Sequence, residues 1–147
     1  DVVARGHATV LGTILAGLGP ILRFLHGTMV LRGLLQEALE PVDVVEAVRD
    51  VGLLASAAAR PQMSVFGEDA YPSFAEKVAA LMESIGRNHA LVDGNKRLTW
   101  AAARVCCLMN GSDLAYEVDE AEALVLDVAQ GKFELSALAG NLRQHLR

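Results

Sequence analysis

The sequence predicts an all-α domain with at most one small β-hairpin. Hydrophobic residues make up 52% of the chain but aromatic residues only 5%, so the core must consist mainly of alanine, leucine and valine. Such a composition favours close helix–helix packing over a sheet. Apolar residues also recur three and four positions apart between proline and glycine breaks, which is the spacing of one helix face. A length of 147 residues suits one domain large enough to bury a core.

The first 28 residues are the hardest to assign. Residues 8–22 carry no charge, but this stretch is shorter than the roughly 20 apolar residues of a membrane helix, and Pro20 and nearby glycines weaken a helix there. We interpret residues 1–28 as an uncertain N-terminal extension, either a core helix or residues not native to the domain, in preference to a peripheral membrane segment. We assign residues 29–147 to the domain, beginning with an amphipathic pattern over Met29–Leu39.

Proline and aspartate divide the next part of the chain. Pro41 interrupts one helical run, and Asp43 can cap the next. An Ala/Leu-rich stripe over Asp50–Arg60 predicts a helix that stops at Pro61, because proline disfavours a helical conformation in its predecessor. Residues 61–71 have mixed turn and strand character, which predicts the one possible hairpin.

A capping box introduces the best-defined helix. Ser73 and Glu76 have the spacing at which two side chains cap a helix start reciprocally, and the helix is predicted to run to about Gly86. Its apolar residues lie on one face and predict the core. These residues are Phe74, Val78, Leu81, Met82 and Ile85.

Further along the chain, more helices are predicted. The apolar pattern over Leu98–Asn110 ends at an Asn-Gly pair, an expected C-terminal stop. Asp119 with Glu122 predicts a capped helix ending near Gly131, and a last helix covers about Ser136–His145.

A polar loop between residues 89 and 97 is the part best suited to chemistry. A histidine can take a proton near neutral pH, and a carboxylate can hold Mg²⁺. Lysine and arginine neutralise phosphate oxygens, and a helix that starts after a glycine turn offers free N–H groups to an anion. The residues concerned are His89, Asp93, Gly94, Asn95, Lys96 and Arg97. They indicate phosphate chemistry, and the alternative is an ordinary polar turn whose charges are solvated.

This loop resembles the signature of the Fic/Doc (Fido) family. Fic proteins typically read His-Pro-Phe, two variable positions, an acidic residue and Gly-Asn-Gly-Arg, whereas Doc (death-on-curing) toxins carry lysine instead of the second of those glycines. Lys96 gives this chain the Doc form, and Leu91 replaces the usual phenylalanine as apolar anchor. Residues 49–62 resemble the helix and flap of Doc-like chains, and the resemblance covers about residues 43–140. It implies a compact Fido-type helical bundle with a small β-hairpin flap.

The resemblance also implies roles for single residues. His89 would be the general base that takes the proton of a target hydroxyl, and Asp93 would coordinate Mg²⁺. The residues implied to bind the nucleotide phosphates are Gly94, Asn95, Lys96 and Arg97. Arg87 would be a further phosphate contact, or only the cation that the end of a helix favours. The structural alternatives are a solvated histidine, an aspartate that caps the next helix, and a solvated pair of surface cations.

The implied function is that of a toxin in a toxin–antitoxin system. A Doc-like enzyme would transfer a phosphoryl group from ATP, with Mg²⁺, to a hydroxyl of a protein, implied to be elongation factor Tu, and so inhibit translation. Lys96 would fill space that the Fic glycine leaves open and so favour a reversed nucleotide with its γ-phosphate at His89. The alternatives are a Fic-type transfer of AMP and a catalytically silent Fido interaction module.

Partners and compartment are expected on further grounds. The chain has no Ser/Thr-x-x-x-Glu-Gly or -Asn inhibitory motif, which favours neutralisation by a separate cognate antitoxin. Residues 61–67 would be a flap that adds a target segment as a strand, or an ordinary connecting loop. A net charge of −5 argues against a broad nucleic-acid-binding face. Cys106 and Cys107 are adjacent and cannot form an ordinary disulfide bridge with each other. They suggest buried thiols in the reducing cytoplasm. No membrane partner is expected.

Overall fold

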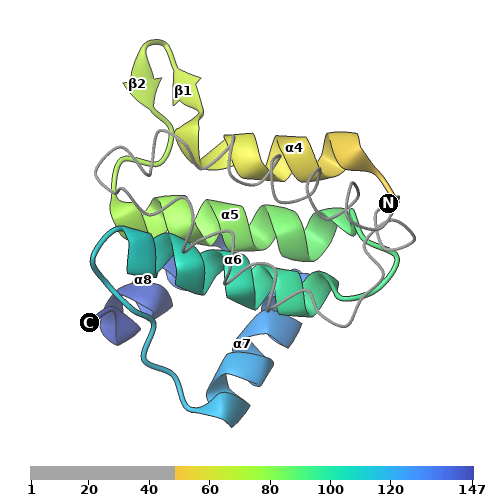
Figure 1. Cartoon of the computed structure of the whole chain (residues 1–147). Coiled ribbons are helices and arrows are strands. Elements are labelled where there is room, and N and C mark those ends of the chain that lie inside the picture. The colour runs from red at the N-terminus through yellow and green to blue at the C-terminus, as the bar shows by residue number, and fades with distance from the viewer. Residues whose placement is uncertain (1–48) are drawn as a thin grey trace.

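The computed structural model describes residues 49–147, and over this range the protein is a helical bundle with one small hairpin (Figure 1). In chain order the elements are α4 (Val51–Ala59), the 3-10 turn η1 (Arg60–Gln62), β1 (Ser64–Val65), β2 (Glu68–Asp69), α5 (Phe74–Asn88), α6 (Asn95–Met109), α7 (Val118–Ala129) and α8 (Leu135–His145). The predicted fold class is confirmed. The predictions for residues 1–48 lie outside the described part of the chain. No helix between residues 49 and 147 is both long and apolar enough to span a bilayer.

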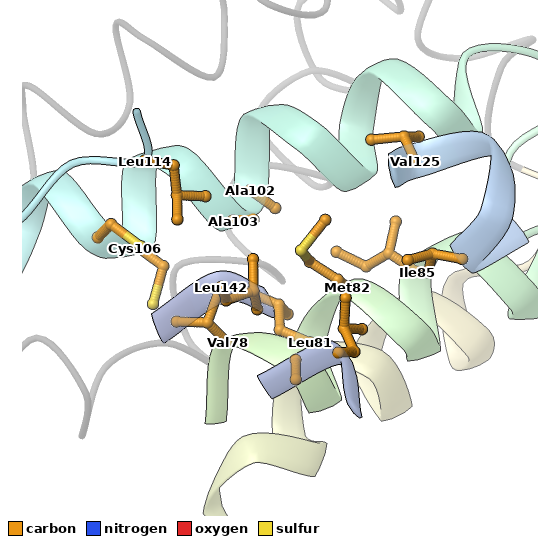
Figure 2. Close-up of a cluster of buried hydrophobic side chains, with 14 of the residues drawn as sticks. Val78, Leu81, Met82, Ile85, Ala102, Ala103, Cys106, Leu114, Val125 and Leu142 are labelled. Atoms are coloured by element: carbon orange, nitrogen blue, oxygen red, sulfur yellow. The ribbon is translucent and has the colours of Figure 1, made fainter. Parts of the chain in front are cut away.

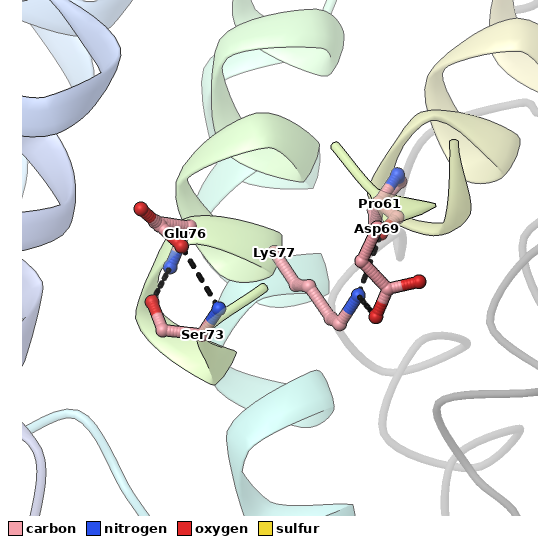
Figure 3. Close-up of polar contacts among 5 residues, drawn as sticks. All are labelled: Pro61, Asp69, Ser73, Glu76 and Lys77. Atoms are coloured by element: carbon pink, nitrogen blue, oxygen red, sulfur yellow. Dashed lines mark hydrogen bonds and ion pairs between the residues drawn. The ribbon is translucent and has the colours of Figure 1, made fainter. Parts of the chain in front are cut away.

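Helix α5 is the centre of the bundle and contacts α4, α6, α7 and α8. The predicted capping box fixes its start (Figure 3): the Ser73 N–H donates to Oε2 of Glu76 at 2.8 Å, and the Glu76 N–H donates to the Ser73 hydroxyl at 3.2 Å. These bonds lower the pKa of the Glu76 carboxyl, and they satisfy donors that a helix start leaves without partners. The helix extends two residues beyond the predicted end, to Asn88.

The core lies where α5 meets α6, α7 and α8 (Figure 2). Of the predicted stripe on α5, Val78, Leu81, Met82 and Ile85 are buried, and Phe74 is partly buried against the core. Helix α6 contributes mostly small side chains, which allows the two helices to approach closely. These buried residues of α6 include Ala102, Ala103, Cys106 and Cys107. The two thiols are free and buried, as predicted, and burial raises the pKa of both, that of Cys107 to about 12.

Gly86 lies where α5 comes close to both α6 and α7. A Cβ atom at this position would lie 3.2 Å from Cγ1 of Val128 on α7 and 3.5 Å from Oγ1 of Thr99 on α6. A side chain larger than hydrogen would therefore press on both helices, so this glycine is kept by packing and not by a turn.

The predicted cap of α7 is wrong by two residues, and so is the helix start that it implies. Glu117, not Asp119, precedes the helix in an extended conformation, and its N–H donates to Oε2 of Glu120 at 3.2 Å. Two pairs of acidic residues have the same capping spacing, Glu117 with Glu120 and Asp119 with Glu122. Backbone pairing selects between them, because the Ala115 N–H donates to the carbonyl of His145 and keeps this segment extended until just before residue 117. Helix α8 starts at Leu135, one residue before its predicted start.

The hairpin confirms the mixed turn and strand prediction for residues 61–71. Strands β1 and β2 are antiparallel, with Ser64 opposite Asp69 and Val65 opposite Glu68. Phe66 and Gly67 form the turn with φ values of 51° and 81°, the positive pair that a tight two-residue hairpin requires. Phe66 is fully exposed at the tip.

Polar contacts attach the base of the hairpin to α5. The Arg60 guanidinium donates to the Tyr71 hydroxyl and to Oε1 of Glu83, both at 2.8 Å. Nζ of Lys77 donates to the Pro61 carbonyl and to Oδ2 of Asp69, both at 3.3 Å (Figure 3). The hairpin is therefore fixed at its base and free of the core at its tip.

A candidate phosphate-binding site at the start of α6

The polar loop joins the end of α5 to the start of α6, at the end of the bundle where the described chain begins (Figure 1). Left-handed backbone marks both ends of the loop: His89 has φ 51° and ψ 49°, and Gly94 has φ 85° and ψ 11°. The Ala90 carbonyl accepts from the N–H groups of Arg49 and Asp50, at 2.8 and 3.1 Å. The loop is therefore tied to the start of α4 as well as to the two helices that it connects.

Helix α6 begins three residues earlier than the sequence pattern predicts. Asn95, Lys96 and Arg97 form its first turn instead of belonging to the loop, and the Leu98 N–H is the first to bond within the helix, to the Gly94 carbonyl at 2.9 Å. Gly94 has no side chain with which to cap the helix. The N–H groups of the first turn are therefore open to an external acceptor, and an anion is the acceptor that this end of a helix favours.

Two cations stand beside these N–H groups. Lys96 and Arg97 are exposed, and Lys96 has no ion-pair partner among residues 49–147. Nη2 of Arg97 lies 4.0 Å from Oδ2 of Asp93 and 3.5 Å from the place of a Cβ on Gly94. Positive side chains at the positive end of a helix dipole disfavour folding slightly. Their presence there makes sense if the turn binds an anion.

Asp93 points its carboxylate into solvent at the edge of this turn. Oδ1 accepts from the Gly94 N–H at 2.7 Å, and the side chain is 88% exposed. Because Gly94 is the N-cap residue of α6, Asp93 does not cap the helix. Within the described residues no group of three or more His, Cys, Asp or Glu side chains converges. The donor set fits Mg²⁺ held by one carboxylate, with phosphate oxygens and water as the other ligands.

Asn95 and Leu91 connect the loop to the helix. The Leu91 N–H donates to Oδ1 of Asn95 at 3.0 Å, and Nδ2 of Asn95 donates to the Leu91 carbonyl at 2.8 Å. Leu91 is only 2% exposed, so leucine serves as the apolar anchor at this position.

His89 and Arg87 lie at the end of α5. His89 is exposed, and its imidazole has no hydrogen bond or ion pair within the described part of the chain. Arg87 lies against Gly131: a Cβ there would be 3.0 Å from Cζ of Arg87. This places the guanidinium at the C-terminal end of α7, where the helix dipole favours a cation.

A pocket of about 790 Å³ runs from Lys96 and Arg97 along α6 to Arg104, with α7 as its other wall. Apart from Glu122, its remaining lining is apolar or aromatic: Trp100, Ala101, Leu114, Tyr116, Val118, Ala121, Val125 and Leu126. The Trp100 and Tyr116 rings meet edge to face, with centroids 5.7 Å apart. Arg104 forms two hydrogen bonds with Asp113, at 3.0 and 3.2 Å, which hold the pKa of that carboxyl low and compensate the arginine charge.

Trp100, Arg104 and Tyr116 were not among the site residues predicted from the sequence. Trp100 does pack partly against the core, but it also lines the pocket. A signal was present, because Lys96, Trp100 and Arg104 follow one another at intervals of four and so share a helix face. Tyr116 carried no such signal, since it reaches the pocket from an irregular segment.

An exposed histidine, a carboxylate and two cations surround an uncapped helix start, which is an arrangement that can accept an anion. Comparison with known proteins defines it further. The sequence model of the Fic/DOC family matches residues 22–107, and the chain belongs to this family. It is 53% identical over 97 residues to Toxin Doc of Mycolicibacterium smegmatis, an alignment that covers 65% of this chain and 75% of that protein. No solved structure matches the chain significantly.

Proposed function

We propose that this chain is a Doc-like toxin of a toxin–antitoxin system that transfers a phosphoryl group from ATP to a hydroxyl of a protein. The similarity to Toxin Doc supports the toxin class. The observation that carries the choice of reaction is Lys96 in the first turn of α6, beside Arg97 and a pocket that leads away from the loop.

In the proposed reaction His89 takes the proton of the target hydroxyl as its oxygen attacks the γ-phosphorus. A new P–O bond forms, and the bond between the γ-phosphorus and the ADP oxygen breaks. Lys96, Arg97 and the N–H groups of the first turn of α6 hold the phosphate oxygens and the charge that develops on them. Mg²⁺ held by Asp93 would supply further neutralisation of phosphate charge.

The course of the pocket favours phosphoryl transfer over AMP transfer. Its lining begins at Lys96 and Arg97 and continues toward Arg104, away from His89 and Asp93. A nucleoside placed against Trp100 and in the apolar part of this pocket would put its phosphates at the first turn of α6. The terminal phosphate would then be nearest to the loop. This is the reversed orientation that the lysine implies.

The partners are proposed on the same grounds. A cognate antitoxin would neutralise the toxin, as the family branch implies, and elongation factor Tu would be the phosphorylated target. The β1–β2 hairpin would present the target segment by adding it as a strand, which its exposed edge and its fixed base allow.

Incubation of the protein and a candidate acceptor with ATP labelled separately at the α- and γ-phosphates tests the proposal. We expect the γ-label, and not the α-label, on the acceptor. Transfer of the α-label would replace the kinase assignment with AMP transfer. An acceptor left unmodified by the intact protein under all conditions, while still bound to it, would indicate a silent interaction module. The His89→Ala variant is the matched negative control.

A further inference from the structure

The side-chain amide of Asn95 is engaged by the backbone of one buried residue. It accepts from the Leu91 N–H at 3.0 Å and donates to the Leu91 carbonyl at 2.8 Å. The amide thus connects Asn95, the first residue of α6, with Leu91 in the middle of the loop. An amide offers a donor and an acceptor side by side, which neither a carboxylate nor a hydroxyl can do in the same geometry. These two bonds use one N–H and one lone pair of the amide and fix the plane of the side chain against the loop.

Leu91 lies two positions after His89, and the backbone conformation of His89 must be held by its surroundings. Its left-handed conformation, φ 51° and ψ 49°, is unfavourable for a residue with a Cβ. Such a conformation persists only where the surrounding structure holds it. The imidazole has no hydrogen bond or ion pair within residues 49–147, whereas the backbone beside it is hydrogen-bonded there.

Within residues 49–147, two sets of bonds reach that backbone immediately after His89. The carbonyl of Ala90 accepts from residues 49 and 50 at the start of α4, and both backbone groups of Leu91 are held by Asn95. The side chains of Ala90 and Leu91 are both buried. The first set fixes the loop to α4. The second fixes it to the helix that carries Lys96 and Arg97, so it determines how His89 lies relative to those cations.

We therefore propose that Asn95 is a positioning residue of the transfer reaction, which sets the orientation of His89 through Leu91. This inference rests on the function proposed above and assigns the phosphate contacts to Lys96, Arg97 and the backbone of the first turn. A binding residue and a positioning residue differ in kinetics. Loss of a ligand weakens binding of ATP, whereas a misplaced base lowers the turnover of bound ATP.

The kinetic test compares Asn95→Ala and Asn95→Asp with Asn110→Ala. Asn110 is the matched control because its Nδ2 donates to the Cys106 carbonyl at 2.8 Å, the same kind of bond at the other end of α6. We expect both Asn95 variants to lose about 10- to 100-fold in kcat while KM for ATP changes less than about twofold. Asn110→Ala should leave both constants unchanged. Asn95→Asp suits a helix start, so it remains informative if the alanine variant does not fold. A raised KM with unchanged kcat, or no change in either, would overturn the inference.

A second measurement does not depend on activity. In NMR spectra of Asn95→Asp, the Cα and Cβ shifts of His89 should move away from left-handed values, and the Leu91 amide should exchange at least about tenfold faster. Asn110→Ala should show neither change. Wild-type protein that transfers no phosphoryl group would refute the proposed function and leave this result intact. Unmoved His89 shifts in Asn95→Asp would refute the positioning role in either case.

Discussion

At the scale of single residues, His89 and Lys96 differ in what their removal should do. His89 is exposed and without a side-chain partner in the described part of the chain, so the fold gains little from its imidazole. Lys96 is exposed at the rim of the pocket and adds a positive charge where the helix dipole is already positive. Neither side chain is explained by stability, which is the pattern expected of residues kept for binding or chemistry.

Replacing His89 with alanine should abolish transfer and leave the fold intact. A positioned general base contributes about 10²- to 10⁴-fold to the rate, whereas an exposed substitution changes stability by less than about 0.5 kcal/mol. Initial rates of acceptor labelling and a denaturant melt measure the two quantities. Growth arrest that persists undiminished in a strain expressing His89→Ala would show that this residue is not the base.

Replacing Lys96 with glycine should sharply lower phosphoryl transfer and open the space that Fic proteins use. Some transfer of AMP is the expected gain. Intact mass of the acceptor separates the products, since a phosphoryl group adds about 80 Da and AMP about 329 Da. An unchanged phosphorylation rate would mean that Lys96 is only a solvated cation, and would remove the main reason for preferring a kinase.

At the scale of elements, the sequence predicted helices well where a local signal and burial agree. The capping box at Ser73 and the stripe on α5 depend on neighbouring residues alone, so both were predicted correctly. The starts of α6 and α7 were predicted wrongly, by three and by two residues. Helix α6 begins at Asn95, because polar first-turn residues carry no apolar signal. Helix α7 begins after Glu117, because pairing with residue 145, remote in sequence, selects the register.

The contact of α5 with α6 and α7 at Gly86 gives a stability prediction. Gly86→Val should destabilise the protein by about 1–3 kcal/mol, because its Cβ already lies 3.2 Å from Val128 and further methyl groups must displace α7 or α6. Gly140→Val is the control, since nothing lies within 4 Å of a Cβ at that helical glycine. Urea melts of both variants measure the difference. Equal loss of stability in the two would show that packing at Gly86 is looser than the structure indicates.

At the scale of the whole molecule, the pocket is what the sequence could not predict. Its walls come from α6, from α7 and from the irregular segment that contains Leu114 and Tyr116. That segment is held by the pairing of Leu114 with Leu146, a contact between distant parts of the chain. The loop residues, by contrast, could be predicted because they are contiguous in sequence. The arrangement of these residues could not be predicted, because the hydrogen bonds between Asn95 and Leu91 and the exposure of Asp93 depend on how the loop folds.

Expression of the active protein should arrest bacterial growth, and co-expression of a small protein encoded beside it should restore growth. The reason is the similarity to Toxin Doc, since the toxin of a toxin–antitoxin pair is neutralised by its partner. The partner is expected to contribute an amphipathic helix that lies in an apolar groove. Colony counts on inducing plates, with His89→Ala as the inactive control, provide the measurement. Harmless high-level expression of the unmutated protein would contradict this prediction.

The alanine-rich contact between α5 and α6 has a genetic consequence. His89 ends one of these helices and the two cations start the other, so the separation of the helices sets the geometry across the loop. Ala79, Ala102 and Ala103 are fully buried in the core cluster, where a larger side chain would have to displace its neighbours. If survivors of toxin expression were selected and sequenced, the inactivating changes would therefore cluster in two places, the loop itself and these alanines. The second group would disable the enzyme without altering any residue of the loop.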